Sequence, residues 1–469
     1  MTFTSPDVAP ALDELVADFA EQHHCPTISW GLVRDGALAH AAAFGTLDAA
    51  ADAAGPPDAH TVYRIASMTK SFTAAAVLGL RDEGQLSLDV PVGDYAPELA
   101  AVRGPAGSPP ITLRHLLSMT SGLATDDAWA DRHLDIDATS IDMVYAAGPS
   151  FAHLTNVAYE YSNLGFGMIG RTVQRATGRR VQEHVTERLL GPLGLTETSW
   201  TEPTDRRWAR PYRWEADQFV PDLPHPIGDG EIAPMGGIWT TVHDLARWVA
   251  WLDDANAHPH QPDAVGLSTA SRREMQRFHT YVGRTTLAGR TSPAGYGFGL
   301  NLRDDADLGI VVSHSGGLPG YGSNMRWIAG SGVGVVALSN VTYAPMSELT
   351  MHILVRLHEL DQLPSRPPLV APEVEAAAHR LVALLNDWTD AAADALFPDN
   401  VALDEAYARR AAAAAQLVAT HGPLRVIAVH PESATSGEVE VQGTGDPFRI
   451  DFQLAPLAGT PVQLYGLPD

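Results

Sequence analysis

The order of strand-like and helix-like segments along the first 360 residues restricts the fold more than any other feature. Two apolar runs, residues 28–33 and 37–44, flank Asp35-Gly36, a two-residue turn signal, and predict a β-hairpin. Further strand-like runs lie far along the chain, at residues 308–313, 325–329 and 333–341. The region in between, residues 111–252, looks mainly helical. We therefore predict one sheet built from distant parts of the chain, with a helical insertion between them.

Several stretches have the spacing of apolar residues that an α-helix requires. From Ser67 onward, apolar residues recur at helical spacing up to Gly84, a residue type that commonly ends helices. Ser67 is therefore expected at or near a helix N-terminus, where backbone N–H groups point outward. Other predicted helical features are segments at 111–123, 164–178 and 347–360, and a capping box of Thr241 with Asp244 before a helix over 245–252.

The character of the sequence changes after a proline-rich stretch at residues 363–368. Alanine-rich helices are predicted at 372–396 and 404–420, followed by strands at 424–430, 438–443, 448–454 and 462–465. We therefore divide the chain into a main domain over residues 1–363, a linker over 364–371, and a small α+β domain over 372–469. The last of these carries no recognisable chemical motif, and its role is not predicted.

The charge of the chain excludes several classes of partner. Its 56 acidic and 31 basic residues give a net charge of -25, with no concentrated basic stripe, so neither nucleic acid nor an anionic membrane is an expected partner. The first twenty residues lack the pattern of a secretory signal, and no apolar run is long enough to cross a bilayer. We therefore expect a cytoplasmic protein. The single cysteine, Cys25, permits no intramolecular disulfide and is expected to be a buried, unreactive residue.

The near-absence of lysine is the most informative feature of the composition. Lys70 is the only lysine, and every other basic residue among the 31 is arginine. Arginine can fill the structural roles of a cation, but only an ammonium gives up its proton readily when it is buried. Lys70 also lies three residues after Ser67, so the two side chains share one face of the predicted helix. A buried lysine can act as the base that a serine nucleophile needs.

Two further segments carry polar side chains that suit acyl chemistry. In the first, Tyr161 could relay a proton to a leaving group, and Asn163 could bind a substrate carbonyl and orient the lysine. The alternative is a tyrosine packed beside an N-capping serine at a helix start. The second segment, His314-Ser315-Gly316-Gly317, follows the predicted strand 308–313. Its strand edge and the helix start at Ser67 could each give a backbone N–H to an oxyanion, or it could be only a glycine-rich strand end.

The order of these three motifs resembles that of the serine β-lactamase/penicillin-binding-protein superfamily, in the branch of class C-like β-lactamases, D-aminopeptidases and esterases. That family carries S-x-x-K, then Y-x-N, then [K/H]-[T/S]-G. The resemblance covers roughly residues 10–360 and includes the segments at 116–123, 191–195 and 235–241. It implies an α+β fold, with an antiparallel sheet flanked by helices, a helical lobe, and the active site at their junction.

The resemblance also implies a role for each residue. Ser67 would be acylated, Lys70 would activate it, and Tyr161 would assist and protonate the leaving group. The N–H groups of Ser67 and Gly317 would form the oxyanion hole. The implied substrate-binding residues are Asn163, His314, Ser315, Gly316 and Gly317.

One departure from the common family pattern bears on specificity. His314 stands where most β-lactamases and penicillin-binding enzymes have a lysine that binds a substrate carboxylate, and a histidine is mostly neutral at pH 7. The resemblance associates this histidine form with D-aminopeptidases, esterases and some transacylating members. Weak β-lactam hydrolysis is therefore expected.

These observations together predict a serine hydrolase that acts through an acyl-enzyme on a small ester, amide or D-amino-acid-containing peptide. One alternative is a transacylase or peptide cyclase of the same fold, and another is a catalytically silent binding or scaffold protein. The chain has 19 histidines but no H-E-x-x-H motif, so neither a metal nor another cofactor is expected. His258-Pro-His260 lies in a polar loop and His23-His24 are adjacent, and neither pattern favours metal ligation. The expected partner is a small-molecule or short-peptide substrate, and no particular oligomeric state is predicted.

Overall fold

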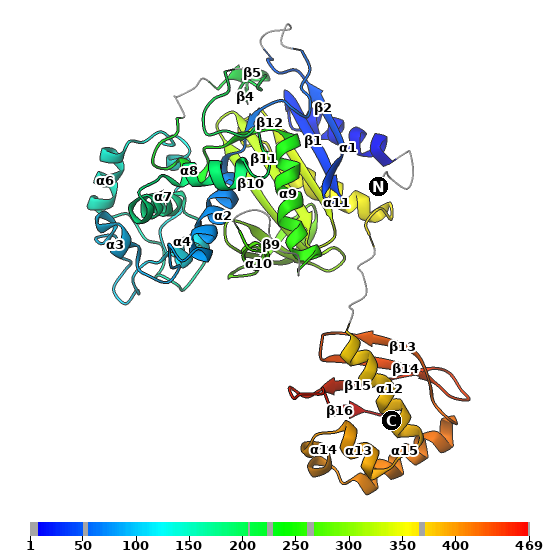
Figure 1. Ribbon diagram of the computed structural model, residues 1–469. Coiled ribbons are helices and arrows are strands. Elements are labelled where there is room, and N and C mark those ends of the chain that lie inside the picture. Colours follow the sequence, from blue (N-terminus) through cyan, green and yellow to red (C-terminus); the bar gives the residue numbers. More distant parts are fainter. Residues whose placement is uncertain are drawn as a thin grey trace. The chain divides into compact units, whose positions relative to one another are not determined.

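A computed structural model describes residues 8–49, 55–204, 207–222, 228–259, 267–364 and 371–467 (Figure 1). The chain forms two compact units, residues 1–364 and 365–469. Most of the predicted proline-rich linker, like His260, falls outside the described residues.

The larger unit is built on an eight-stranded antiparallel sheet in the order β2-β1-β12-β11-β10-β9-β8-β7. The predicted hairpin forms, with Asp35 and Gly36 both at positive φ in its turn, and β1 pairs with β12 along its length. Distant parts of the chain therefore share one sheet, as predicted. The strands are β1 (Thr27–Arg34), β2 (Ala37–Gly45), β7 (Thr280–Leu287), β8 (Arg290–Tyr296), β9 (Asn301–Asp305), β10 (Gly309–Leu318), β11 (Tyr321–Ile328) and β12 (Val333–Ser339).

Helices cover both faces of the sheet (Figure 1). α1 (Val8–Gln22) packs against α11 (Met346–Glu359), and α11 lies on β11 and β12. α9 (Val242–Ala257) packs against β1 and β12. Because the central strands are covered on both sides, β12 is buried throughout, which explains its continuous apolar run.

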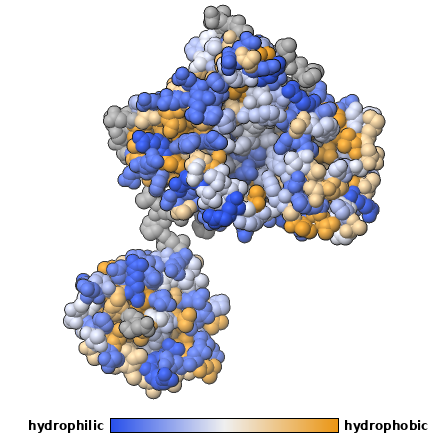
Figure 2. Space-filling view, turned by 180° about the vertical axis from the view of Figure 1, so that it is seen from behind, coloured by the Kyte–Doolittle hydropathy of each residue, from blue (hydrophilic) through white to orange (hydrophobic). Residues whose placement is uncertain are grey.

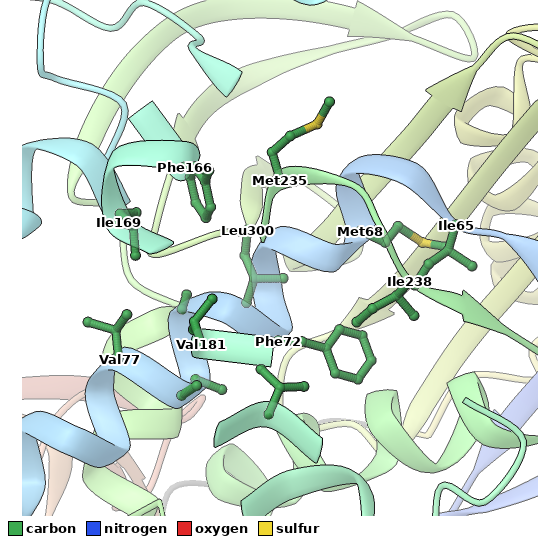
Figure 3. Packing of buried hydrophobic residues seen from close by; sticks show 14 of the residues in the cluster. Ile65, Met68, Phe72, Val77, Phe166, Ile169, Val181, Met235, Ile238 and Leu300 are labelled. Atoms are coloured by element: carbon green, nitrogen blue, oxygen red, sulfur yellow. The ribbon is translucent and has the colours of Figure 1, made fainter. Parts of the chain in front are cut away.

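A helical lobe is inserted between β2 and the later strands of the sheet. Its helices are α2 (Thr69–Asp82), α3 (Val92–Tyr95), α4 (Leu113–Leu117), α5 (Asp127–Ala130), α6 (Ala138–Ala147), α7 (Asn163–Thr177) and α8 (Val181–Val185). Two pairs of short strands accompany the lobe: β3 (Tyr63–Arg64), just before α2, pairs with β6 (Trp239–Thr240), and β4 (Tyr212–Glu215) pairs with β5 (Gln218–Pro221). α10 (Thr269–Met275) precedes β7. Side chains from α2, from α7 and from the segment before β6 point toward one another (Figure 3), which fixes α2 in the core.

Two local predictions were wrong in their details. The helix predicted over 111–123 ends at Leu117, because Met119 and Gly122 adopt positive φ and turn the chain. The reciprocal capping box at α9 does not form. Thr241 accepts the Asp244 N–H at 3.2 Å, but the Asp244 carboxylate turns instead to the backbone N–H of Glu197 at 2.7 Å.

The smaller unit is an antiparallel four-stranded sheet packed against α12. Its strands are β13 (Arg425–Pro431), β14 (Ser436–Gln442), β15 (Phe448–Leu454) and β16 (Val462–Gly466), close to the predicted ones. Its helices are α12 (Pro372–Asn386), α13 (Asp390–Leu396), α14 (Asp399–Asp404) and α15 (Tyr407–His421). The single helix predicted at 372–396 is in fact two helices, α12 and α13, because Thr389 caps a new helix by accepting the Ala392 N–H.

The surface and the single cysteine agree with an ordinary globular protein. Hydrophilic and hydrophobic residues are interspersed on the face shown in Figure 2. No helix within the described residues is both long and apolar enough to span a bilayer. Cys25 is buried, and burial raises the pKa of its thiol to about 11, which makes it a poor nucleophile.

Candidate active site

Ser67 sits in a tight turn between β3 and α2. The backbone of Ala66, just before it, has a φ of 48°, a left-handed conformation that is costly for a residue with a Cβ. Residues Ala66–Met68 form a single 3₁₀ turn that runs directly into α2. Ser67 is therefore at a helix start, as predicted, and 9% of it is exposed.

The side chain of Lys70 reaches Ser67 from one turn further along. Lys70 is fully buried, and its Nζ lies 3.0 Å from Ser67 Oγ, 2.7 Å from Asn163 Oδ1 and 3.0 Å from the Met235 carbonyl oxygen. An ammonium donates to all three atoms. A neutral amine has only two N–H bonds, and both would go to Asn163 and Met235, whose oxygens can only accept. Its lone pair would then point at the Ser67 hydroxyl.

Burial brings the pKa of Lys70 close to neutral pH. Desolvation lowers the pKa of Lys70 to about 7, while the nearby carboxylates of Asp127, Asp131 and Asp126 act in the opposite direction. A lysine with this pKa is partly neutral at pH 7 and can accept a proton from a serine hydroxyl. Arginine could not replace it, because its guanidinium stays protonated.

The position of Asn163 is fixed by a residue that sequence analysis did not identify. Asn163 is completely buried at the first position of α7, and its Nδ2 donates to Asp127 Oδ1 at 2.7 Å. This hydrogen bond turns Oδ1 of the amide toward Lys70. Both polar ends of Asn163 are thus engaged within the protein, so the arrangement favours the orienting role over contact with a substrate carbonyl.

The ring of Tyr161 lies beside Lys70 and packs against the hydrophobic core. Its ring centroid is 4.8 Å from Lys70 Nζ, and its hydroxyl is hydrogen-bonded to the Ser67 side chain. Burial raises the pKa of Tyr161 well above its ordinary value. The phenol therefore keeps its proton at neutral pH, which suits a group that passes a proton on rather than a permanent base.

The third motif lies at the end of β10, beside the turn that holds Ser67. A Cβ on Gly316 would stand 2.0 Å from the Ile65 carbonyl oxygen, so only glycine lets the strand approach this closely. Ser315 is exposed, and its Oγ accepts from Asn324 Nδ2 at 2.9 Å. Gly317 is half-buried beneath the ring of Tyr343, where a Cβ would stand 2.6 Å from that ring.

His314 is buried and uncharged, unlike the cation that most relatives carry at this place. Its Nδ1 donates to the Ser315 carbonyl oxygen at 2.7 Å, and its Nε2 therefore accepts from the Tyr296 hydroxyl at 3.1 Å. Burial, with the nearby charge of Lys70, lowers the pKa of His314 to about 3. His314 can therefore supply neither a positive charge nor a free ring nitrogen in this arrangement.

Several residues around the site were missed because no short sequence pattern marks them. Asp126 accepts the backbone N–H groups of Asn163 and Leu164, both at 2.7 Å. Asp131 accepts from the hydroxyl of Tyr343 at 2.9 Å, and burial raises its pKa to about 7. Their partners lie 37 to 212 positions away in the sequence, so only the fold brings them together.

Comparisons with known proteins identify relatives over much of the chain. The chain is 24% identical over 348 residues to the protein flp of Staphylococcus aureus (strain N315), covering 74% of this chain. The chain spans 66% of the length of that relative. It is 31% identical over 283 residues to the uncharacterized protein MT1414 of Mycobacterium tuberculosis (strain CDC 1551 / Oshkosh), covering 54% of this chain and 68% of that protein.

The fold has a solved counterpart, the octameric penicillin-binding protein homologue from Pyrococcus abyssi. That structure matches with a TM-score of 0.65 and 21% identity, over 95% of this chain and 96% of the other. The sequence profile of the Beta-lactamase family matches residues 12–360, most of the chain and all of the residues around Ser67. The chain therefore belongs to the Beta-lactamase family, within the superfamily of serine β-lactamases and penicillin-binding proteins.

Proposed function

We propose that this protein is a serine hydrolase that forms an acyl-enzyme at Ser67 with a small ester, amide or D-amino-acid-containing peptide. The observation that carries the proposal is the environment of Lys70. Its neutral amine has two obligate acceptors, Asn163 Oδ1 and the Met235 carbonyl, so its lone pair is directed at Ser67 Oγ. A purely structural cation would not need a pKa near 7.

Acylation begins with transfer of the Ser67 proton to the neutral Lys70 amine as Oγ attacks the substrate carbonyl carbon. The carbonyl oxygen becomes an oxyanion, which the backbone N–H groups of Ser67 and Gly317 stabilise. Such preorganised donors commonly contribute a hundredfold to a thousandfold, about 3–4 kcal/mol, to the rate. In support of this role, the 3₁₀ turn that contains Ser67 packs against β10, whose residues after Ser313 pair with β11 alone.

Collapse of the tetrahedral intermediate requires a proton on the leaving group. Tyr161 lies beside both Lys70 and Ser67, and its phenol keeps its proton at neutral pH. It can therefore donate this proton outward to the leaving alcohol or amine and receive one from Lys70. The same groups, used in reverse, activate the water that releases the acyl group and returns Ser67 to its starting state.

The environment of His314 argues against carboxylate-bearing substrates such as β-lactams. Because its imidazole is buried and neutral, this position lacks the cation that would bind such a carboxylate. Uncharged esters and amides, and substrates with a free amino group, do not depend on that cation. We therefore expect short esters and D-amino-acid amides to be better substrates than β-lactams.

The test combines labelling with a substrate panel. A fluorophosphonate or penicillin-type acylating agent should label the protein at Ser67, and Ser67→Ala should abolish this label, as read by intact-mass and peptide mass spectrometry. The panel is p-nitrophenyl esters, D-amino-acid p-nitroanilides and nitrocefin, with and without an added amine acceptor. Undiminished labelling of Ser67→Ala would sink the nucleophile assignment. Nitrocefin as the best substrate would sink the specificity, and predominant transfer to the amine would make the protein a transacylase.

A further inference from the structure

Three potential metal ligands converge at a place that the chemistry of Ser67 does not use. We propose that His60, Glu197 and His243 form a binding site for one divalent transition-metal ion, with Zn²⁺ as the ion that fits the donors best. One ligand atom from each residue lies within 4.8 Å of the other two. Two imidazole nitrogens and a carboxylate oxygen are a common Zn²⁺ donor set, with a further position left for water.

The backbone, rather than the three side chains themselves, holds these residues together. His60 stands in the turn before β3, Glu197 in the loop after α8, and His243 in the first turn of α9. β3 pairs with β6 through Tyr63 and Thr240, and Ser199 pairs with Trp239 through two backbone hydrogen bonds of 2.8 and 2.9 Å. The loops therefore have fixed positions even without an ion, which lowers the cost of ordering a site.

The distances suit a tetrahedral ion. His60 Nδ1 is 2.9 Å from Glu197 Oε1, and His243 Nδ1 is 3.6 Å from Glu197 Oε2. The two imidazole rings are tilted by 42° to each other, with their centroids 4.9 Å apart. With Zn–N and Zn–O bonds of about 2.0–2.2 Å, ligand atoms of a tetrahedral site stand about 3.3 Å apart, so small rotations of the side chains would suffice.

A surface ion pair between His60 and Glu197 would account for only part of this arrangement. Nδ1 of His243 is inaccessible to solvent and has no hydrogen-bond partner. Oδ1 of Asp244, whose side chain is completely buried, also has none, and it lies 3.4 Å from that same nitrogen. A buried nitrogen without a partner is destabilising, a penalty that a bound metal ion would remove.

The charge of the surroundings also favours a cation. The N-terminus of α9 carries a partial positive charge that would oppose one. The carboxylates of Glu197 and Asp244 more than offset it, and both are held in place by hydrogen bonds. Thr241 Oγ1 donates to Glu197 Oε2 at 2.8 Å, and Thr198 Oγ1 donates to Asp244 Oδ2 at 2.9 Å. Such outer hydrogen bonds orient ligating carboxylates in known metal sites.

The proposed ion would connect the segment before the nucleophile to the loop after α8 and to the start of α9. Its proposed role is to join these segments of the larger unit, and it does not depend on the proposed hydrolase activity. Its test uses the full-length protein, stripped with a chelator, and measures metal binding and thermal unfolding rather than turnover.

Isothermal titration with ZnCl₂ should show one tight site per chain, Zn²⁺ should raise the melting temperature, and Co²⁺ should give the visible absorption of a four- or five-coordinate ion. His60→Ala removes an exposed ligand and should fold normally, so it is the main variant; His243→Ala and Glu197→Gln complete the set. Each should weaken Zn²⁺ binding at least tenfold. His430→Ala, which removes a similar histidine–glutamate pair (His430 Nε2 to Glu440 Oε2, 3.0 Å), should leave binding unchanged.

Two results would overturn the proposal. One is a wild-type protein that binds no Zn²⁺ at micromolar concentrations, and the other is a folded His60→Ala variant that binds it as tightly as the wild type. Circular dichroism of each variant separates loss of the site from loss of the fold. Loss of labelling at Ser67 with intact Zn²⁺ binding would count against the proposed hydrolase and leave the metal site standing.

Discussion

Lys70 Nζ lies 3.0 Å from Ser67 Oγ, and the other two oxygens that it contacts can only accept hydrogen bonds. The direction of the hydrogen bond between Lys70 and Ser67 therefore depends on the charge of Lys70. The ammonium donates to Ser67 and holds it inactive, whereas the neutral amine accepts from Ser67 and activates it. Fixing the two acceptors is therefore as important to the proposed chemistry as placing the lysine.

The first prediction concerns the replacement of Lys70 by the other cation. Lys70→Arg keeps a positive charge but removes a base that can lose its proton, so acylation should fall about a hundredfold to ten-thousandfold. The rate of Ser67 labelling measures this directly, with circular dichroism and thermal melting as the check on folding. A folded Lys70→Arg protein with near-normal labelling would move the base to another residue.

The second prediction is the pH dependence of acylation. Only the neutral form of Lys70 is active, and burial lowers its pKa to about 7, so the rate should rise about tenfold per pH unit below 7 and level off above it. His314, with a pKa of about 3, and Tyr161, with a pKa well above its ordinary value, should not titrate in this range. A rate of labelling that falls as pH rises from 5 to about 8 contradicts this account. The pKa of Asp131 is also raised to about 7, so its charge changes over the same pH range as that of Lys70. Asp131→Asn removes this second titration and should make the pH profile of labelling steeper.

A third prediction separates the effect of the Asp127 charge from that of its hydrogen bond to Asn163. Its charge raises the pKa of Lys70, and its Oδ1 orients Asn163. In Asp127→Asn the amide oxygen can still accept from Asn163, but the charge is gone, so the midpoint of the pH profile should move to lower pH. The exposed Asp446, in the smaller unit, gives the matched control Asp446→Asn, which should leave the midpoint in place. An unshifted midpoint in Asp127→Asn would show that the charge of Asp127 does not set the pKa of Lys70.

A fourth prediction concerns the smaller unit, to which we assign no catalytic residue. It has its own hydrophobic core, which includes Leu381, Val439 and Phe452, and the chain divides at residue 364. A protein ending at Pro364 should therefore label at Ser67 with a rate within about threefold of the full chain, since labelling needs only the residues around Lys70. A folded truncated protein that no reagent labels would refute this assignment.

Sequence patterns predicted the elements that are marked by turn residues or by regular apolar spacing. The hairpin at Asp35-Gly36, the helix start at Ser67 and the strands after residue 308 follow from turn chemistry and apolar spacing. β7, β8 and β9 were not predicted, because strands near the edge of the sheet such as β7 alternate between exposed and half-buried residues and lack a continuous apolar run. The break between α12 and α13 was missed because alanine favours a helix on both sides of it, so the composition does not mark where α12 ends.

In the candidate site, too, local contacts could be predicted from the sequence and long-range contacts could not. Ser67 and Lys70 lie one helical turn apart, so their contact could be inferred from spacing alone, and His314 could be recognised as uncharged from its type. Asp127 reaches Asn163 from 36 residues away, and His60 reaches Glu197 from 137 residues away. Contacts of this kind depend on how the lobe packs against the sheet, and no short motif encodes them.

The most direct test of the central claim is the titration of Lys70 itself. Because the chain contains one lysine, protein made with lysine labelled with ¹³C at Cε gives a single lysine signal in NMR, which needs no assignment. We predict that this signal titrates with a pKa of about 7 in the folded protein, and that the signal moves to the ordinary value of about 10.4 on unfolding in denaturant. A signal in the folded protein that titrates near 10 would contradict the account, because Lys70 would then be protonated throughout the working pH range and could not serve as the base.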